Sequence, residues 1–182
     1  MKRPFLLTGL LALLSVSAAA DAEDNTAPDW TLYTPEGSSV ELSQVSKDKP
    51  QIILFWATWC PFCKALMPHL QSIRLEYGND IGILAISIME DGDPASYITE
   101  AGFDFTLLMD GDPVAEEYGI TGTPGVIIID TRRKIRFDLR NLPGIELGIN
   151  GEKLSRKQTA KQLAPYWAAE IRRALDTLDI NK

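Results

Sequence analysis

One stretch, residues 51–68, constrains the fold of this chain more than any other. It begins with the apolar run 52–56, continues through a Trp-Cys-Pro-Phe-Cys-Lys motif at 59–64 and leads into an amphipathic segment. An apolar run with almost no alternation is expected of a strand whose two faces are both covered by helices. The two cysteines therefore follow a buried strand and stand at the beginning of a helix.

Cys60 and Cys63 are the only cysteines of the chain. At a helix N-terminus the unpaired amide hydrogens and the positive end of the macrodipole stabilise a thiolate, so we expect Cys60 to be the acidic, exposed, attacking thiol. Cys63, one turn inside the helix, becomes its resolving partner. Pro61 at a first helical position already has the φ angle of the helix and stiffens the turn between the sulfurs. The pair is predicted to open and close as a redox-active disulfide.

Other uses of two cysteines fit the sequence less well. A structural disulfide here would enclose only two residues, whereas stabilisation by loop closure favours long loops. A zinc site would need further thiolate or imidazole ligands, and the chain has no second cysteine pair and one histidine, His69, which we interpret as a surface or packing residue. Covalent haem requires His directly after the second cysteine, where this chain has Lys64. We therefore predict no metal and no cofactor.

The N-terminal residues 1–20 have the features of a secretory signal. Lys2 and Arg3 precede an apolar stretch, and small residues end it, so that cleavage is expected after Ala20 or Ala22. An uncleaved N-terminal anchor is the alternative. Export would place the two cysteines in an oxidising compartment, where a reversible dithiol needs a dedicated reductant or acts as an oxidant itself.

The charge of the chain excludes some partners. Without Lys2 and Arg3, 16 basic and 25 acidic side chains leave a net charge of −9, which argues against nucleic acid or anionic lipid as a partner. Residues 21–182 are one domain's worth of chain. We expect a monomer with no membrane span after signal cleavage.

Strand and helix patterns alternate along the chain, which favours an α/β fold with a mainly parallel central sheet. A proline at the mouth of a buried strand cannot donate to the ladder, so we predict that the Thr123-Pro124 bond is cis. The predicted elements are a hairpin at 27–42, strands at 51–56, 81–88, 105–109 and 126–130, an antiparallel edge strand at 134–137, helices from 61, 94 and 113, a long loop at 141–157 and a last helix at 158–178.

These features together resemble the thioredoxin superfamily. The resemblance rests on the Trp-Cys-x-x-Cys-Lys motif after a Phe-Trp-Ala strand, on Pro68 inside the following helix, and on Thr123-Pro124 before a buried strand. The N-terminal hairpin and an extra βα segment between 80 and 118 are similar to the exported TlpA/ResA branch. The resemblance implies a thioredoxin-like fold: a central mixed sheet flanked by helices, with an N-terminal β-hairpin and an inserted βα segment.

The same resemblance implies a protein disulfide oxidoreductase, most simply a periplasmic reductase. Cys60 would be the nucleophile and Cys63 the resolving thiol, in thiol–disulfide exchange through a mixed disulfide. Its partners would be protein thiols and disulfides, together with a membrane-associated electron donor or acceptor. The residues that would bind substrate are Trp59, Pro61, Phe62, Thr123 and Pro124.

The chain also departs from the pattern it resembles. Leu54 stands where thioredoxins often have a buried acid, and Leu66 stands where many TlpA/ResA proteins have a glutamate, so neither carboxylate is available for proton transfer at Cys63. The loop 141–157 is longer than the usual link, and we expect it to border the partner site. Two other classes stay open: a peroxiredoxin-like peroxidase, and a Cu(I)-binding metallochaperone that uses both thiolates.

Overall fold

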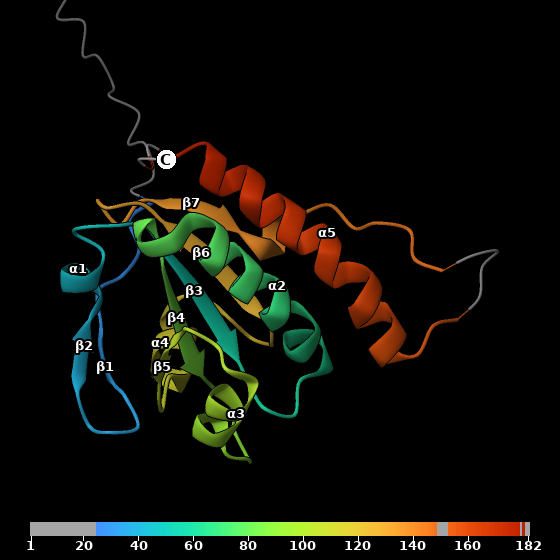
Figure 1. Ribbon diagram of the computed structural model, residues 1–182, viewed down its shortest axis with the longest axis horizontal. Helices are drawn as coiled ribbons and strands as arrows, with labels where there is room; N and C mark the ends of the chain where they lie inside the picture. The colour runs from blue at the N-terminus through green and yellow to red at the C-terminus, as the bar shows by residue number, and fades with distance from the viewer. Residues whose placement is uncertain (1–24, 149–152, 179, 181–182) are drawn as a thin grey trace, which may run out of the picture.

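The computed structural model describes residues 25–148, 153–178 and 180, and its centre is a five-stranded sheet with the strand order β5-β4-β3-β6-β7. Helices lie on both sides of this sheet, and a two-stranded hairpin stands at its side (Figure 1). The predicted signal, residues 1–20, lies outside the described residues. Within the described residues, no helix combines the length and the apolar character that a membrane crossing requires.

The strands are β1 Thr31–Tyr33, β2 Ser39–Glu41, β3 Gln51–Trp56, β4 Gly82–Ser87, β5 Thr106–Leu108, β6 Gly125–Ile129 and β7 Ile135–Asp138. The helices are α1 Leu42–Val45, α2 Pro61–Tyr77, α3 Pro94–Ala101, α4 Asp112–Glu117 and α5 Arg156–Asp176, with 3₁₀ turns η1 Gly78–Asp80 and η2 Leu139–Asn141.

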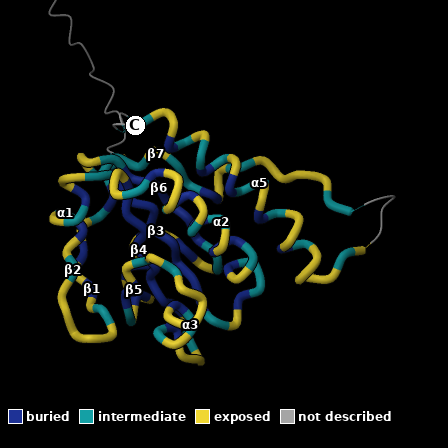
Figure 2. Tube along the Cα trace, viewed as in Figure 1, coloured by how far each residue is buried: buried dark blue, intermediate teal, exposed yellow. Residues whose placement is uncertain are grey.

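Strand β3 is the middle of the sheet and is buried along its whole length. It pairs in parallel with β4, from Gln51 opposite Gly82 to Trp56 opposite Ser87, and antiparallel with β6. Side chains of alternate β3 residues enter two different apolar clusters. One cluster, which includes Ile52 and Leu54, packs under α2 and α5. The other, which includes Ile53 and Phe55, packs under α4 and the hairpin. Figure 2 shows β3 as a buried segment in the interior of the molecule. Coverage of both faces explains why the strand sequence lacks alternation.

The ends of the two long helices follow from their sequences. Pro61 is the first residue of α2, where its missing amide hydrogen costs nothing, and Gly78 ends the helix with a positive φ of 56°. Ser155 and Gln158 form a reciprocal capping box that begins α5. Helix α5 lies against α2 (Figure 1).

Three sequence expectations need correction. The sheet is not mainly parallel, because β6 and β7 both run antiparallel to their neighbours, so parallel and antiparallel pairings are equal in number. The segment after the hairpin forms the short helix α1, which is not among the elements that the sequence predicted, and its first residue Leu42 is fully buried. The last helix begins at Arg156 rather than at 158, because Ser155 supplies its N-cap.

Candidate active site

Cys60 and Cys63 lie at the carboxyl end of β3, where the chain enters α2. Cys60 is the N-cap of α2, and its sulfur accepts a hydrogen bond from the backbone amide of Cys63 with an N···S distance of 3.2 Å. The Cys60 thiol lies 3.5 Å from the carbonyl oxygen of Thr123, to which it can donate. Both cysteines are free thiols. The strand, the helix N-terminus and the Thr123 loop therefore meet at one sulfur.

The surroundings of Cys60 favour its thiolate. A hydrogen bond from the Cys63 side chain contributes most to lowering the pKa of Cys60, from an ordinary 9.0 to about 6. The Thr123 hydroxyl and the amides of Phe62 and Cys63 add to the effect, while burial opposes it. At pH 7 a thiol with this pKa is about 90 % ionised, compared with about 1 % for an ordinary one. Cys60 has the character expected of an attacking nucleophile.

Cys63 is in the opposite situation. Burial raises the pKa of Cys63 far above the range of an ordinary thiol, and the hydrogen bond to Cys60 and the charge of Cys60 raise it further. The Cys63 side chain is fully buried on the inner face of α2, so it is protonated while Cys60 is an anion. When Cys60 is ionised, the two sulfurs share a single proton, and Cys63 carries it.

The expectation of an exposed Cys60 is wrong. The residue is only 1 % exposed, because the segment that carries Thr123 and Pro124 packs against its sulfur. The Thr123-Pro124 peptide bond is cis, as predicted. Direct access of a substrate sulfur to Cys60 from open solvent is therefore limited.

The predicted substrate-binding residues surround the cysteines. Trp59 is 45 % exposed, and its indole nitrogen donates to the carbonyl oxygen of Met89 at 2.7 Å, which fixes the ring beside the motif. Pro61 and Phe62 are half-buried on the other side of Cys60, and Phe62 packs on Trp167 of α5 with ring centroids 6.2 Å apart. Thr123 and Pro124 close the third side. The structure thus brings all five residues to one rim.

Comparison with known proteins agrees with this geometry. The model of the AhpC/TSA family matches residues 24–138, more than half of the chain. The chain belongs to the AhpC/TSA family. It is 28 % identical over 160 residues to the thiol:disulfide interchange protein DsbE of Escherichia coli K12, which covers 75 % of this chain and 85 % of that protein. It is also 28 % identical over 149 residues to the thiol-disulfide oxidoreductase ResA of Halalkalibacterium halodurans, with 74 % and 84 % covered.

A solved structure shows the same fold. The thioredoxin domain of the thiol-disulfide oxidoreductase BVU-2223 from Bacteroides vulgatus superposes with a TM-score of 0.57 at 26 % identity, covering 66 % of this chain and 89 % of that one. The predicted thioredoxin-like fold and the resemblance to the TlpA/ResA branch are confirmed. Within the AhpC/TSA family, this chain is a thiol-disulfide oxidoreductase.

A carboxylate that the sequence reading missed fixes the turn before the motif. Glu90 accepts hydrogen bonds from the amide of Thr58 at 2.8 Å and from its hydroxyl, and also from the amides of Asp91 and Gly92 at 3.0 Å each. Although burial opposes ionisation, these bonds hold the pKa of Glu90 below its usual value. A Cβ on Gly92 would lie 2.4 Å from the Thr58 hydroxyl oxygen, so this close approach requires glycine. Only the acidic character of the loop 90–93 hinted at this role.

No carboxylate stands at the positions of Leu54 and Leu66 beside the cysteines. Leu54 and Leu66 are fully buried in the same apolar cluster as both cysteines. Tyr97 of α3 lies nearby: its ring is 5.5 Å from that of Trp56, and the Lys64 ammonium is 5.2 Å from its centroid. Apolar and aromatic side chains therefore surround Cys63 and account for its raised pKa.

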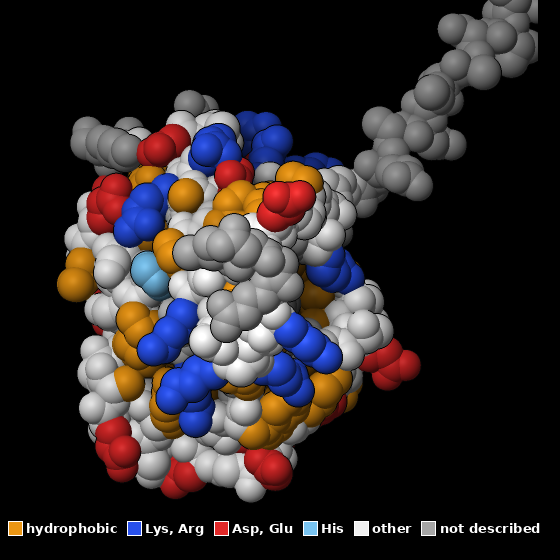
Figure 3. Space-filling view, turned by 90° about the vertical axis from the view of Figure 1, so that its right-hand side faces the viewer, with side chains coloured by type: hydrophobic (Ala, Val, Ile, Leu, Met, Phe, Trp, Pro, Cys, Tyr) orange, Lys and Arg blue, Asp and Glu red, His pale blue; other side chains and the backbone are white. Residues whose placement is uncertain are grey.

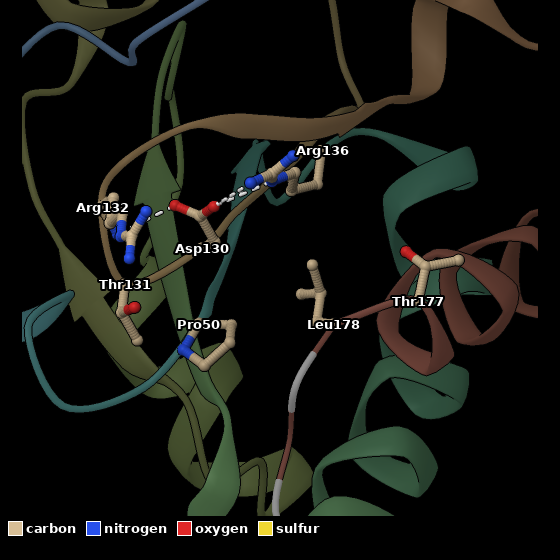
Figure 4. A pocket seen from close by; sticks show the side chains of 7 residues that line it. All are labelled: Pro50, Asp130, Thr131, Arg132, Arg136, Thr177 and Leu178. Carbon is tan, nitrogen blue, oxygen red and sulfur yellow. Dashed lines mark hydrogen bonds and ion pairs between the residues drawn. The ribbon is translucent and has the colours of Figure 1, made fainter.

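A pocket at the other end of the sheet is not the functional site. Pro50, which precedes β3, borders it together with Asp130 and the turn that follows β6 (Figure 4). Its Arg136 points at Asp130, with an N···O distance of 2.5 Å, so the charges of these two side chains compensate each other. Among the described residues, no group of three or more His, Cys, Asp or Glu side chains is arranged to hold a metal ion.

Alkylation of the reduced protein by iodoacetamide should follow the titration of Cys60, with a midpoint near pH 6. Replacing Cys63 by alanine removes the strongest of the hydrogen bonds to the Cys60 thiolate, so the midpoint should move to higher pH. In Cys60→Ser the remaining buried thiol should react slowly throughout. The rate can be followed by mass spectrometry across pH 4 to 10, roughly the range over which protein thiols titrate. A wild-type midpoint near 9 would contradict the assignment.

Replacing Glu90 by glutamine should destabilise the protein by about 1–3 kcal/mol, because the amide offers one acceptor oxygen fewer and no charge to the five donors, which include the Ser87 hydroxyl. Urea unfolding measures the loss, and Trp59 fluorescence reports on the turn itself. Asp91→Asn is the matched control, since it removes the same charge from an exposed neighbour. Equal effects of the two substitutions would show that Glu90 has no special part in holding the turn.

Proposed function

We propose that this protein reduces disulfides of exported protein substrates in the periplasm, with Cys60 as the nucleophile and Cys63 as the resolving thiol. The observation that carries the proposal is the pair of opposed pKa values: a thiolate at the N-cap of α2 and a protonated thiol one turn inside the helix. A pKa of about 6 for Cys60 lies nearer to the value of about 7 for thioredoxin than to the value of about 3.5 for the strong oxidant DsbA.

The reaction proceeds in two exchanges. The Cys60 thiolate attacks one substrate sulfur, the substrate S–S bond breaks, and the second substrate sulfur leaves as a thiolate. Cys63 then loses its proton and attacks the Cys60 sulfur, which releases the reduced substrate and leaves a Cys60–Cys63 disulfide. Two electrons pass from the pair to the substrate. A membrane-associated dithiol donor must return them before the next cycle.

The first exchange itself prepares the second. Two of the causes that raise the pKa of Cys63, its hydrogen bond to Cys60 and the negative charge of Cys60, act only while Cys60 is a thiolate. Formation of the mixed disulfide removes both, so the Cys63 pKa falls at the step in which it must ionise. The departing substrate thiolate is a base within reach of that proton. This sequence of events needs no carboxylate at the positions of Leu54 and Leu66.

The reduction potential of the Cys60–Cys63 couple tests the direction of exchange. The protein is equilibrated in dithiothreitol or glutathione buffers, and the fluorescence of Trp56 and Trp59 reports the redox state. A value more negative than about −200 mV, toward the −270 mV or so of thioredoxin, supports a reductase. A less negative value, toward about −120 mV, would make the protein an oxidant or isomerase. Turnover of hydrogen peroxide in the same buffers would favour the peroxidase instead.

A further inference from the structure

The N-terminal half of α5 carries positive charge that nothing in the described structure compensates. Residues 153–169 include four basic side chains and no acidic one: Lys153, Arg156, Lys157 and Lys161. The whole chain has a net charge of −7, so this concentration of positive charge runs against its composition. We call the surface formed by Arg156, Lys157 and Lys161 the basic rim.

The basic rim borders the cysteine motif. The guanidinium of Arg156 lies 5.8 Å from the ring centroid of Phe62, the residue that directly precedes Cys63 in the motif. Lys157 and Lys161 are exposed one turn apart on the same helix. On the face of the molecule that includes the N-terminal half of α5, Lys and Arg side chains gather with hydrophobic side chains between them (Figure 3).

The charges of the rim are free for a partner. Elsewhere in the described residues, most arginines are in ion pairs: Arg74 with Asp104, Arg133 with Asp29, Arg136 with Asp130, Arg140 with Asp138, Arg172 with Glu76 and Arg173 with Glu170. None of the ion pairs found there includes a residue of the basic rim. Unpaired like charges beside one another are unfavourable, and an oppositely charged ligand relieves that cost.

The other side of Cys60 has the opposite sign. The indole nitrogen of Trp59 donates a hydrogen bond to the carbonyl oxygen of Met89, and the loop that follows Met89 carries Glu90, Asp91 and Asp93. A substrate segment that reaches Cys60 therefore meets negative charge on the Trp59 side and positive charge on the Phe62 side. The family match ends at residue 138, so α5 and its basic residues lie outside the part that this chain shares with the family model.

We propose that the basic rim selects protein substrates with acidic residues next to the reactive cysteine. The inference rests on the proposed exchange with protein disulfides and adds a substrate class to it. Aspartate or glutamate side chains beside the substrate cysteine contact Lys157, Lys161 and Arg156, while the aromatic surface of Phe62 and Trp167 contacts the neighbouring apolar groups. The effect is mainly on the rate of association, because exposed charges steer an encounter more than they hold a complex.

The test compares peptide disulfides that differ only in the residues beside the cysteine: aspartate, serine or lysine. Reduction by the reduced protein should be fastest for the aspartate peptide, about tenfold faster than for the lysine peptide at about 0.05 M salt, and the difference should largely vanish at about 0.5 M salt. The neutral 2-hydroxyethyl disulfide serves as the uncharged reference. Equal rates for the three peptides would overturn the substrate preference, whereas no reduction of any disulfide would overturn the proposed function.

Charge reversal locates the effect. Lys157→Glu with Lys161→Glu should reverse the order of the peptides and leave the rate with the neutral disulfide unchanged, which also shows that the variant is folded. Lys47→Glu with Arg132→Glu changes the net charge equally at exposed residues near the opposite end of β3, and should preserve the order. The neutral pair Lys157→Gln with Lys161→Gln should make the three peptides equal. If Lys157→Glu with Lys161→Glu only releases the protein from phosphatidylglycerol vesicles, the rim binds a membrane and the proposal is wrong.

Discussion

Replacing Cys63 by serine is expected to stop turnover and to leave Cys60 joined to its substrates in stable mixed disulfides. The reason is that the first exchange needs only the Cys60 thiolate, while release needs a second thiol one helical turn away. Serine keeps the size and the hydrogen-bond donor of Cys63, so Cys60 should still attack. Adducts should appear on non-reducing gels after incubation with disulfide substrates and disappear with dithiothreitol.

The reverse substitution is the control. Cys60→Ser should lose exchange entirely and trap no adducts, because the remaining thiol is fully buried and protonated. If Cys60→Ser accumulated mixed disulfides and Cys63→Ser did not, the roles of the two sulfurs would be exchanged. Their opposed pKa values would then describe a resting pair without describing the order of attack.

The reduction potential should change its dependence on pH near 6. Below this pH, reduction of the disulfide takes up two protons and the potential should fall by about 59 mV per pH unit; above it, Cys60 stays ionised, one proton is taken up, and the slope should halve to about 30 mV. Cys63 adds no second break in the accessible range, because its pKa is raised. Equilibration at a series of pH values measures the slope directly.

The same titration stabilises the folded dithiol form. Because folding lowers the pKa of Cys60 from 9.0 to about 6, the stabilisation is present in full above pH 9 and is lost as the pH falls through 6. At pH 7 it amounts to about 1 kcal/mol. Thr123→Val removes a hydroxyl that lowers this pKa and should move the break to higher pH. A slope that stays constant from pH 5 to 8, the window around roughly pH 6, would contradict the assignment.

Local patterns in the sequence were enough to predict the parts of the site that lie within one segment. The buried run predicted β3 with its observed bounds, and Pro61 predicted the first residue of α2. The cis bond at Thr123-Pro124 followed from a proline that could not donate to a ladder. Each of these depends on the conformational preference of neighbouring residues, which the sequence alone expresses.

Contacts between distant segments could not be predicted in this way. Glu90 lies 32 positions from Thr58, and in this region the sequence predicted only a helix from 94, whose N-cap is Asp93. The burial of Cys60 depends on a loop that arrives 63 positions later. The sequence indicated an exposed thiol because a helix N-terminus by itself leaves that position open.

The sequence by itself determined the chemistry: two thiols three positions apart at the beginning of a helix that follows a strand buried on both faces. The tertiary structure alone decided how these thiols differ and what surrounds them. Burial and the hydrogen bonds between them set the two pKa values, and the packing of α5 on α2 brings Arg156 to Phe62 from 94 positions away. The physical reason is that pKa values and surface charge depend on solvation and distance, and both exist only once the chain has folded.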